Sequence, residues 1–308
     1  MGIGSTDMSG SARGASGAGS ARSARRRFGI LAYPAGQSLS PLMFNAAFEA
    51  LGMGGTGNTS GASYEVFEIA PPDFDAFMRA REFDGLSVSA PYKERVMGFL
   101  DFVDEDARKI GAVNTVSKGL EAGTQLSGFN TDFVGAVEAL EEKRGSLHGK
   151  KVVILGAGGA ARAITYGLLR EGAEVVVLNR NLEEAKRLGE DLGVEVGLLS
   201  SVTGRECDIL IQATSVWMTS GLDVKIVPDS YVAGIGARSG AVMDIVYKPL
   251  MTPLLEVACE AGCRVITGEK MLLNQAVKQF EIWFGEELAT GVVREIMGKV
   301  LEEALKTD

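Results

Sequence analysis

Two kinds of hydrophobic periodicity alternate along the chain, one typical of β-strands and one typical of α-helices. In the first half, short apolar or alternating runs predict strands over residues 28–32, 64–69 and 85–89. Segments with helical spacing predict helices over residues 41–51, 74–81 and 132–143. Ser40 stands where the N-cap of the first helix is expected, and residues 54–61 are expected to form a flexible loop. This alternation predicts an α/β domain.

The second half repeats the alternation more regularly. Apolar runs predict four strands, over residues 152–155, 175–178, 209–211 and 242–246. Because helical segments separate these strands, we expect parallel pairing with crossover helices. Residues 271–305 have a helical pattern and are expected to pack back on the first domain. The pattern therefore predicts two α/β domains, with the boundary near residues 145–150.

Residues 1–27 differ in composition from the rest of the chain. They are rich in Gly, Ser, Ala and Arg, and such a segment buries too little apolar surface to offset its ordering entropy. We therefore expect a disordered tail. An organellar transit peptide and, from the arginines at 25–27 before Phe28, a twin-arginine export signal are the alternatives.

Charge and composition exclude several classes of protein. The chain has 31 basic and 40 acidic residues, a net charge of −9 and a pI near 5.0, which argues against a nucleic-acid-binding surface. No apolar run reaches the roughly 18 residues that cross a bilayer. The three cysteines, Cys207, Cys259 and Cys263, fit no disulfide framework and favour a cytoplasmic setting. A single histidine, His148, argues against a histidine-rich metal site, so we expect no metal.

A glycine-rich turn follows the first strand of the second half and opens a helix. Its spacing is G-x-G-x-x-A, in which small residues allow a tight turn and a close backbone approach to a pyrophosphate. This pattern predicts a doubly wound Rossmann-type dinucleotide-binding domain over residues 146–270. The expected cofactor-binding residues of the turn are Gly156, Ala157, Gly158, Gly159 and Ala160.

The end of the next strand indicates which dinucleotide binds. NAD sites usually carry an acidic residue there, but this strand ends in Asn179 and Arg180. An arginine can pair with the 2′-phosphate of NADP, which favours NADP. Glu183 and Glu184 follow closely and would repel that phosphate unless they point away, so NAD stays possible.

Seven further motifs occur in order along the chain, at residues 38–41 with Asn45, 87–93, 110–115, 128–135, 213–215, 247–254 and 268–275. The segment from Ser87 to Lys93 reads Ser-Val-Ser-Ala-Pro-Tyr-Lys. These motifs resemble those of the shikimate dehydrogenase family, in which that segment reads N-V-T-x-P-x-K. The family reduces 3-dehydroshikimate to shikimate with NADPH in the chorismate pathway to the aromatic amino acids. The resemblance implies a substrate-binding α/β domain over residues 28–145 together with the C-terminal helices 271–308.

Lys93 and Asp132 are the expected catalytic residues. Reduction of a ketone needs a proton donor at the carbonyl oxygen, and an ammonium held beside a carboxylate can give and recover that proton. A surface lysine after Pro91 and a helix N-terminal acid are the alternative interpretations of these two residues.

The resemblance also implies the ligands of substrate and cofactor. Ser38 and Ser40 are expected to hold the substrate carboxylate, with Ser89 and Tyr247 nearby. Asn114, Asp132 and Gln275 are expected to bind the ring hydroxyls. Further cofactor contacts are expected from Thr214, Gly268 and Met271. Trp217 stands where the family usually has glycine.

Two departures from the family pattern affect the expected substrate. Ser87 replaces asparagine and Ser89 replaces threonine, and the freed space could accept the extra hydroxyl of quinate. A quinate or dual quinate/shikimate dehydrogenase is therefore an alternative. A regulatory protein that senses nucleotides without turnover and an amino-acid- or folate-type dehydrogenase are more remote alternatives. We expect a monomer or a homodimer.

Overall fold

The computed structural model describes residues 25–36, 38–54, 61–119, 125–214, 216, 224–288 and 291–306. Most of the expected tail, most of the loop expected at 54–61 and Trp217 lie outside these residues. The tail boundary predicted at residue 27 is wrong, because β1 spans Arg26–Ala32 and pairs with β2 from Arg26 onward. Arg27 forms an ion pair with Glu65 of β2 at 2.9 Å, so the sheet holds arginines that the composition assigns to the tail.

The first sheet has six strands in the order β2-β1-β3-β5-β6-β4. β1 is parallel to β2 and β3, whereas β5 is antiparallel to both β3 and β6, and β4 is parallel to β6. The remaining bounds are β2 Ala62–Glu68, β3 Gly85–Val88, β4 Phe102–Val103, β5 Thr115–Lys118 and β6 Leu126–Phe129. Its helices are α1 Ser40–Ala50, α2 Phe74–Ala80, the short η1 Arg95–Phe99 and α3 Glu105–Ile110.

The second sheet is entirely parallel, with the order β12-β11-β10-β7-β8-β9. This order is the doubly wound one, and the connections reverse direction between β7 and β10. The strands are β7 Lys151–Leu155, β8 Glu174–Asn179, β9 Glu195–Leu198, β10 Ile209–Gln212, β11 Ala241–Asp244 and β12 Arg264–Ile266. The connecting helices are α5 Gly159–Arg170, α6 Leu182–Leu192, η2 Leu199–Gly204, α8 Asp229–Gly236 and α9 Pro253–Glu260.

Alternate residues of the second sheet enter two separate cores, as the pleat of a buried strand requires. Val152 and Ile154 of β7 pack with α5 and with α4, which spans Asp132–Arg144. Val153 and Leu155 pack toward α8 and α9 on the other face. The fold is therefore α/β with two domains, as predicted.

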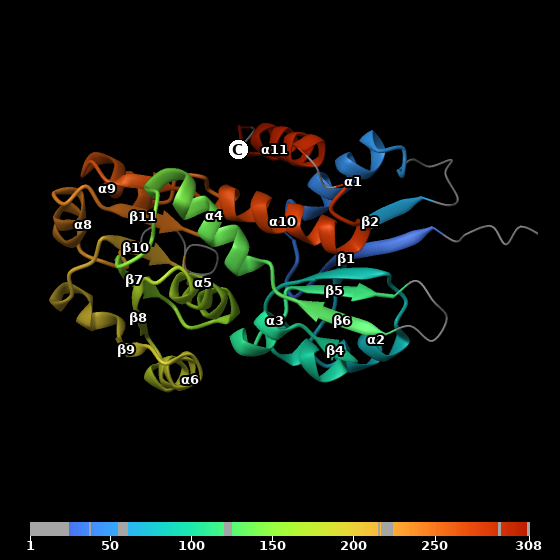
Figure 1. Cartoon of the computed structure of the whole chain (residues 1–308), viewed down its shortest axis with the longest axis horizontal. Helices are drawn as coiled ribbons and strands as arrows, with labels where there is room; N and C mark the ends of the chain where they lie inside the picture. Colours follow the sequence, from blue (N-terminus) through green and yellow to red (C-terminus); the bar gives the residue numbers. More distant parts are fainter. Residues whose placement is uncertain are drawn as a thin grey trace, which may run out of the picture.

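Two C-terminal helices follow the second sheet, α10 over Gly268–Phe284 and α11 over Gly291–Lys306. Both contribute to the aromatic core of the first sheet, where Trp283 packs against Phe28 and Phe44. α10 begins at Gly268, three residues before the predicted start of the C-terminal helical segment. Figure 1 shows α10 in the middle of the molecule, beside α4 and between the two sheets.

The close contact between α4 and α10 depends on Gly135. A Cβ atom at this position would lie 2.8 Å from the Met271 carbonyl oxygen and 2.9 Å from the Gln275 backbone nitrogen. The absence of a side chain therefore lets the two helix backbones touch. This contact brings the N-terminus of α4 next to the first two turns of α10.

Polar contacts also join α3 to α5 across the two domains. Arg162 of α5 is buried and donates to the Ile110 carbonyl oxygen of α3 at 2.8 Å, while Asp191 of α6 holds its guanidinium within the second domain at 2.5 Å. One helical turn later, Tyr166 donates to Asp106 of α3 at 2.5 Å. These bonds fix the helix after the glycine turn against the segment that leads to Asn114.

Several local expectations differ from the structure. Ser40 is the first residue of α1, and Leu39 occupies the N-cap position without a side-chain cap. The short strands β4, β5, β6, β9 and β12 were not predicted, because each has only two to four residues and little apolar alternation. Within the described residues, no helix combines the length and apolar character needed to cross a membrane.

We predict that Gly135→Ala lowers the free energy of unfolding. Overpacking against the backbone of α10 costs about 1–3 kcal/mol, which outweighs a gain of roughly 1 kcal/mol in helix propensity. Gly234→Ala is the matched control, because this glycine of α8 has open space around its Cβ position. Urea unfolding should show a loss for the first variant and none for the second, and equal stabilisation of both would contradict the close contact.

Candidate functional site

A cavity of about 590 Å³ lies between the two sheets, at the carboxyl ends of their parallel strands. The segments after β1 and β3 line one side, and those after β7, β8, β10 and β11 line the other. α10 closes the cavity between them. Every site residue expected from the sequence lines this one cavity, which is also where ligands bind in doubly wound folds, at the switch point of the strand order.

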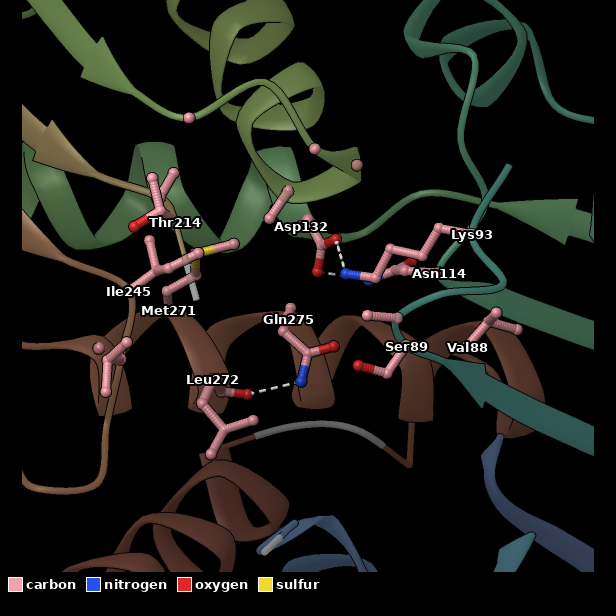
Figure 2. A pocket seen from close by; sticks show the side chains of 18 of the residues that line it. Val88, Ser89, Lys93, Asn114, Asp132, Thr214, Ile245, Met271, Leu272 and Gln275 are labelled. Carbon is pink, nitrogen blue, oxygen red and sulfur yellow. Dashed lines mark hydrogen bonds and ion pairs between the residues drawn. The ribbon is translucent and has the colours of Figure 1, made fainter. Parts of the chain in front are cut away.

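Lys93 and Asp132 form an ion pair in the cavity wall. The Lys93 Nζ lies 2.7 Å from Asp132 Oδ2, and the two side chains are 18% and 7% exposed. Lys93 follows β3, and Asp132 is the first residue of α4, where the helix dipole favours a carboxylate. Figure 2 shows the pair projecting into the space between β3 and α10. A cation that remains partly open to the cavity can donate a proton to a bound oxygen.

The Asn114 amide holds the Asp132 carboxylate in place, and Asn130 caps the Asp132 backbone. Asn114 donates from Nδ2 to Asp132 Oδ1 at 2.8 Å and to Thr131 Oγ1 at 2.9 Å. Its Oδ1 accepts from the Thr131 backbone at 2.8 Å, and Asn130 accepts from the Asp132 backbone at 3.0 Å. Both amide hydrogens of Asn114 are thus used within the protein, so in this structure it orients Asp132.

A second layer of polar side chains supports Asn114, and its central residue is not among those expected from the sequence. Gln279 is buried, donates to the Asn114 carbonyl oxygen at 3.1 Å and accepts from Ser87 at 2.6 Å. Tyr64 donates to Ser87 at 2.6 Å, and burial raises the pKa of the Tyr64 phenol. The sequence feature that could have identified Gln279 is its position one helical turn after Gln275, on the buried face of α10.

Hydroxyl groups gather at the end of the cavity next to the first sheet. Ser38 and Ser40 lie on either side of the start of α1, and the Ser40 backbone donates to Ser38 Oγ at 3.3 Å. Tyr247 follows β11 and approaches from the second domain. Burial raises the pKa of its phenol, against the opposing effect of hydrogen bonds with Leu39 and Ser38, so the group remains a neutral donor. Neutral hydroxyls of this kind suit a polyhydroxylated carboxylate.

Gln275 and Ser89 complete the side of the cavity beside Lys93. Gln275 donates to the Leu272 carbonyl oxygen at 2.8 Å within α10. Figure 2 shows its carboxamide oxygen turned toward the cavity and the Ser89 hydroxyl on the side facing it. The two groups lie on opposite walls, which allows one small ligand to contact both.

The glycine turn leaves a bare helix N-terminus at the opposite end of the cavity. Gly156 has a φ of +115°, and a Cβ there would lie 2.8 Å from the Ala213 carbonyl oxygen. Gly158 occupies the N-cap position of α5 without a side chain and has open space around its Cβ position. Ala157, Gly159 and Ala160 line the cavity at the same turn. Unobstructed backbone N–H groups at a helix N-terminus form an anion site, which fits a pyrophosphate.

The wall between the two ends is formed by Thr214, Gly268 and Met271. The Thr214 backbone donates to the Gln212 side chain at 2.6 Å, which fixes the end of β10. A Cβ at Gly268 would lie 2.5 Å from the Ile245 carbonyl oxygen, so only glycine lets α10 begin this close to β11. Figure 2 shows Met271 beside Thr214 and Ile245, facing the Lys93–Asp132 pair across the cavity.

The far rim of the cavity contains Asn179, Arg180 and Glu184. Within the part of the chain that the structure describes, no carboxylate forms an ion pair with Arg180, which stays available for a phosphate. The open glycine turn and this arginine together fit NADP. The described ranges contain no group of three or more His, Cys, Asp or Glu side chains that could hold a metal.

Comparisons with known proteins agree with this arrangement. Residues 30–116 match the family model of the shikimate dehydrogenase substrate-binding domain. Residues 138–219 match the model described as shikimate/quinate 5-dehydrogenase, and residues 268–297 match the shikimate 5′-dehydrogenase C-terminal domain.

Individual relatives cover most of the chain. The shikimate dehydrogenase (NADP(+)) of Thermococcus kodakarensis is 41% identical over 87% of this chain and 94% of its own. That of Caldanaerobacter subterraneus is 38% identical over 84% and 91%. The crystal structure of shikimate 5-dehydrogenase from Thermus thermophilus in complex with NADP(H) and shikimate has a TM-score of 0.74 and 32% identity, covering 89% of this chain and 99% of its own.

We predict that Asn114→Asp destabilises the chain in a pH-dependent way. The variant sets a second carboxylate against Asp132, and mutual repulsion raises the pKa of one member of the pair. When folding raises the pKa of a carboxyl, the folded protein becomes less stable as the pH rises through that value. The decrease in the free energy of unfolding should therefore be smallest below a pH of about 4. Asn114→Ala removes the same hydrogen bonds without adding charge. Urea unfolding at acidic and neutral pH should show a growing loss only for Asn114→Asp, and a constant loss would contradict this account.

Proposed function

The chain belongs to the shikimate dehydrogenase family, and we propose that it catalyses the reversible, NADPH-dependent reduction of 3-dehydroshikimate to shikimate in chorismate biosynthesis. The observation that carries this proposal is the Lys93–Asp132 pair in the same cavity as the open glycine turn. A proton donor and a dinucleotide site on facing walls are what reduction of a ketone requires.

Lys93 acts as the acid in this proposal. NADPH, when bound, supplies the hydride to the carbonyl carbon, and the Lys93 ammonium gives a proton to the carbonyl oxygen. Asp132 holds the ammonium at 2.7 Å and balances its charge in a wall that is largely shielded from water. In the reverse direction Lys93 takes the proton back from the hydroxyl. Asn114 fixes the carboxylate that orients this exchange.

We assign the substrate carboxylate to the hydroxyl-rich end of the cavity. Ser38, Ser40, Ser89 and Tyr247 would donate to it, and Asp132 and Gln275 would contact the ring hydroxyls. Asn114, whose amide hydrogens bond within the protein, would position Asp132 instead of donating to the substrate. The raised pKa of Tyr247 supports this assignment, because a phenol that keeps its proton can donate to an anion.

We assign the cofactor to the second domain. The pyrophosphate would lie on the turn from Gly156 to Ala160, and the nicotinamide would lie between Thr214, Gly268 and Met271. Asn179 and Arg180 would contact the adenosine ribose and its 2′-phosphate.

The domain limits and cellular setting belong to the same proposal. We place the substrate domain at residues 26–145 with the helices from 268 onward, and the nucleotide domain at 146–267. Cys207, Cys259 and Cys263 are free thiols, which supports a cytoplasmic location. The net charge of −9 supports a small-molecule enzyme without nucleic-acid binding. We expect it to act as a monomer or homodimer.

We predict that Lys93→Ala lowers turnover at least about a hundredfold, the usual contribution of one acid–base group, while NADPH affinity stays unchanged. Lys109→Ala is the control, because this exposed lysine pairs with Glu105 away from the cavity. Shikimate oxidation followed by NADPH absorbance, with NADPH binding followed by fluorescence, separates the two effects. Retained turnover would remove Lys93 from the mechanism. A wild type that binds nucleotide but turns over nothing would favour the nucleotide-sensing alternative.

A quinate or dual quinate/shikimate dehydrogenase is the second candidate, favoured by the family model that names both substrates. Two serines are expected to enlarge the substrate site. Ser87 is buried, and its hydroxyl is hydrogen-bonded to Tyr64 and Gln279. Both serines line the cavity, but the Ser87 hydroxyl is held by these two partners, whereas Figure 2 shows the Ser89 hydroxyl directed toward the cavity. Any widening of the site for the extra hydroxyl of quinate therefore depends on Ser89.

We predict that Ser89→Thr lowers the kcat/KM for quinate relative to that for shikimate. One methyl group in a fitted pocket changes discrimination by about 1–3 kcal/mol, so the ratio should fall about fivefold or more. Ser63→Thr, on β2 and outside the cavity wall, is the matched control. An unchanged ratio would show that Ser89 does not limit the space for the substrate.

A further inference from the structure

The two glutamates at the start of α6 have different surroundings. Glu183 is 77% exposed, pairs with Lys186 at 2.9 Å and does not line the cavity. Glu184 lines the cavity together with Arg180. Of the two acids that follow the end of β8, only Glu184 faces the position where the adenosine ribose of a dinucleotide is expected.

Two asparagines hold the Glu184 carboxylate at this rim. Asn179 donates to Glu184 Oε2 at 3.0 Å, and Asn181 donates to Glu184 Oε1 at 3.1 Å. Asn181 is itself fixed, because its Oδ1 caps α6 by accepting from the Glu183 and Glu184 backbones at 3.0 and 3.4 Å. Because each carboxylate oxygen accepts a hydrogen bond, the carboxylate is held at the cavity rim even though Glu184 is exposed to solvent.

This carboxylate and Arg180 favour different dinucleotides at the same rim. Sites for NAD place an acid at the end of the second strand, where it accepts hydrogen bonds from the ribose hydroxyls, whereas sites for NADP place an arginine that pairs with the 2′-phosphate. Here Arg180 comes from the strand end, and Glu184 reaches the same rim from the first turn of the following helix. A 2′-phosphate therefore meets an attractive cation and a repulsive anion together.

We propose that Glu184 is a specificity-determining residue that weakens the preference for NADP and allows this chain to use NAD as well. The proposal rests on the NADPH-dependent activity proposed above. The asparagines act as positioning residues, because they hold the carboxylate that meets the ribose. NAD presents only hydroxyl groups there, so Glu184 can accept a hydrogen bond from it without repulsion.

The test compares two small probes that differ only at the 2′ position, adenosine 2′,5′-bisphosphate and AMP. Titration calorimetry of the full chain gives the dissociation constant of each and requires no turnover. Glu184→Gln should bind the bisphosphate about fivefold more tightly, the size expected of one solvent-screened charge close to a phosphate. Its affinity for AMP should be unchanged or lower, because the neutral amide is a weaker acceptor.

Glu183→Gln is the matched control, because it removes the same charge one residue away, where the carboxylate faces Lys186. The proposal requires that this variant leave the ratio of the two dissociation constants nearly unchanged. An unchanged ratio in Glu184→Gln, or an equal change in both variants, would overturn it, since either result means that the carboxylate does not act locally.

Steady-state oxidation of shikimate with NADP⁺ and NAD⁺ completes the test. Glu184→Gln should raise the ratio of kcat/KM for NADP⁺ over NAD⁺ by a factor similar to that found in binding. A wild type that uses NADP⁺ alone, with no measurable use of NAD⁺, would overturn the proposed dual use. Absence of shikimate oxidation with either cofactor would refute the proposed function, whereas the probe titration would still decide the role of Glu184.

Discussion

The close contact of α4 and α10 at Gly135 is the constraint on which the site depends. α4 carries Asp132 at its first residue, and α10 carries Met271 and Gln275 in its first two turns. Because a Cβ at Gly135 would lie within 3 Å of the α10 backbone, the two helices touch only through glycine. The contact sets the distance between the carboxylate that holds Lys93 and the wall assigned to the nicotinamide.

The electrostatics of the site follow from the same arrangement. Lys93 and Asp132 form an ion pair in the cavity wall, and the side chains that support the pair are neutral amides and hydroxyls. Burial of an ion pair is favourable only when further hydrogen bonds satisfy the ions, and Asn114 supplies one to Asp132. The supporting layer continues through Gln279, so a residue of α10 stabilises a carboxylate on α4 without touching it.

The sequence predicted the second sheet better than the first. Its central strands are buried on both faces, which gives uninterrupted apolar runs such as that of β7, and the glycine turn marks where the helix begins. The first sheet includes β5 and β6, whose four-residue segments contain Thr, Ser and Gly. Such strands form because they pair with each other and with β3. Their sequences therefore show little of the hydrophobic periodicity that predicts a strand. Arg26 was likewise assigned to the tail from composition, although it pairs with β2.

The chemical groups of the site can be identified from the order of residues alone: a lysine and an aspartate in motifs of small polar residues, a glycine turn between strand and helix, and an arginine at the end of the next strand. These features are local, because spacing along the chain suffices to specify a turn or a helix start. Which side chains contact one another depends on the folded chain. In the folded chain both amide hydrogens of Asn114 bond within the protein, and Gln279 contacts Asn114 although the two residues are 165 positions apart. Glu184 lines the cavity, whereas Glu183 does not. The reason is that the direction and partners of a side chain depend on packing between segments that are distant in sequence.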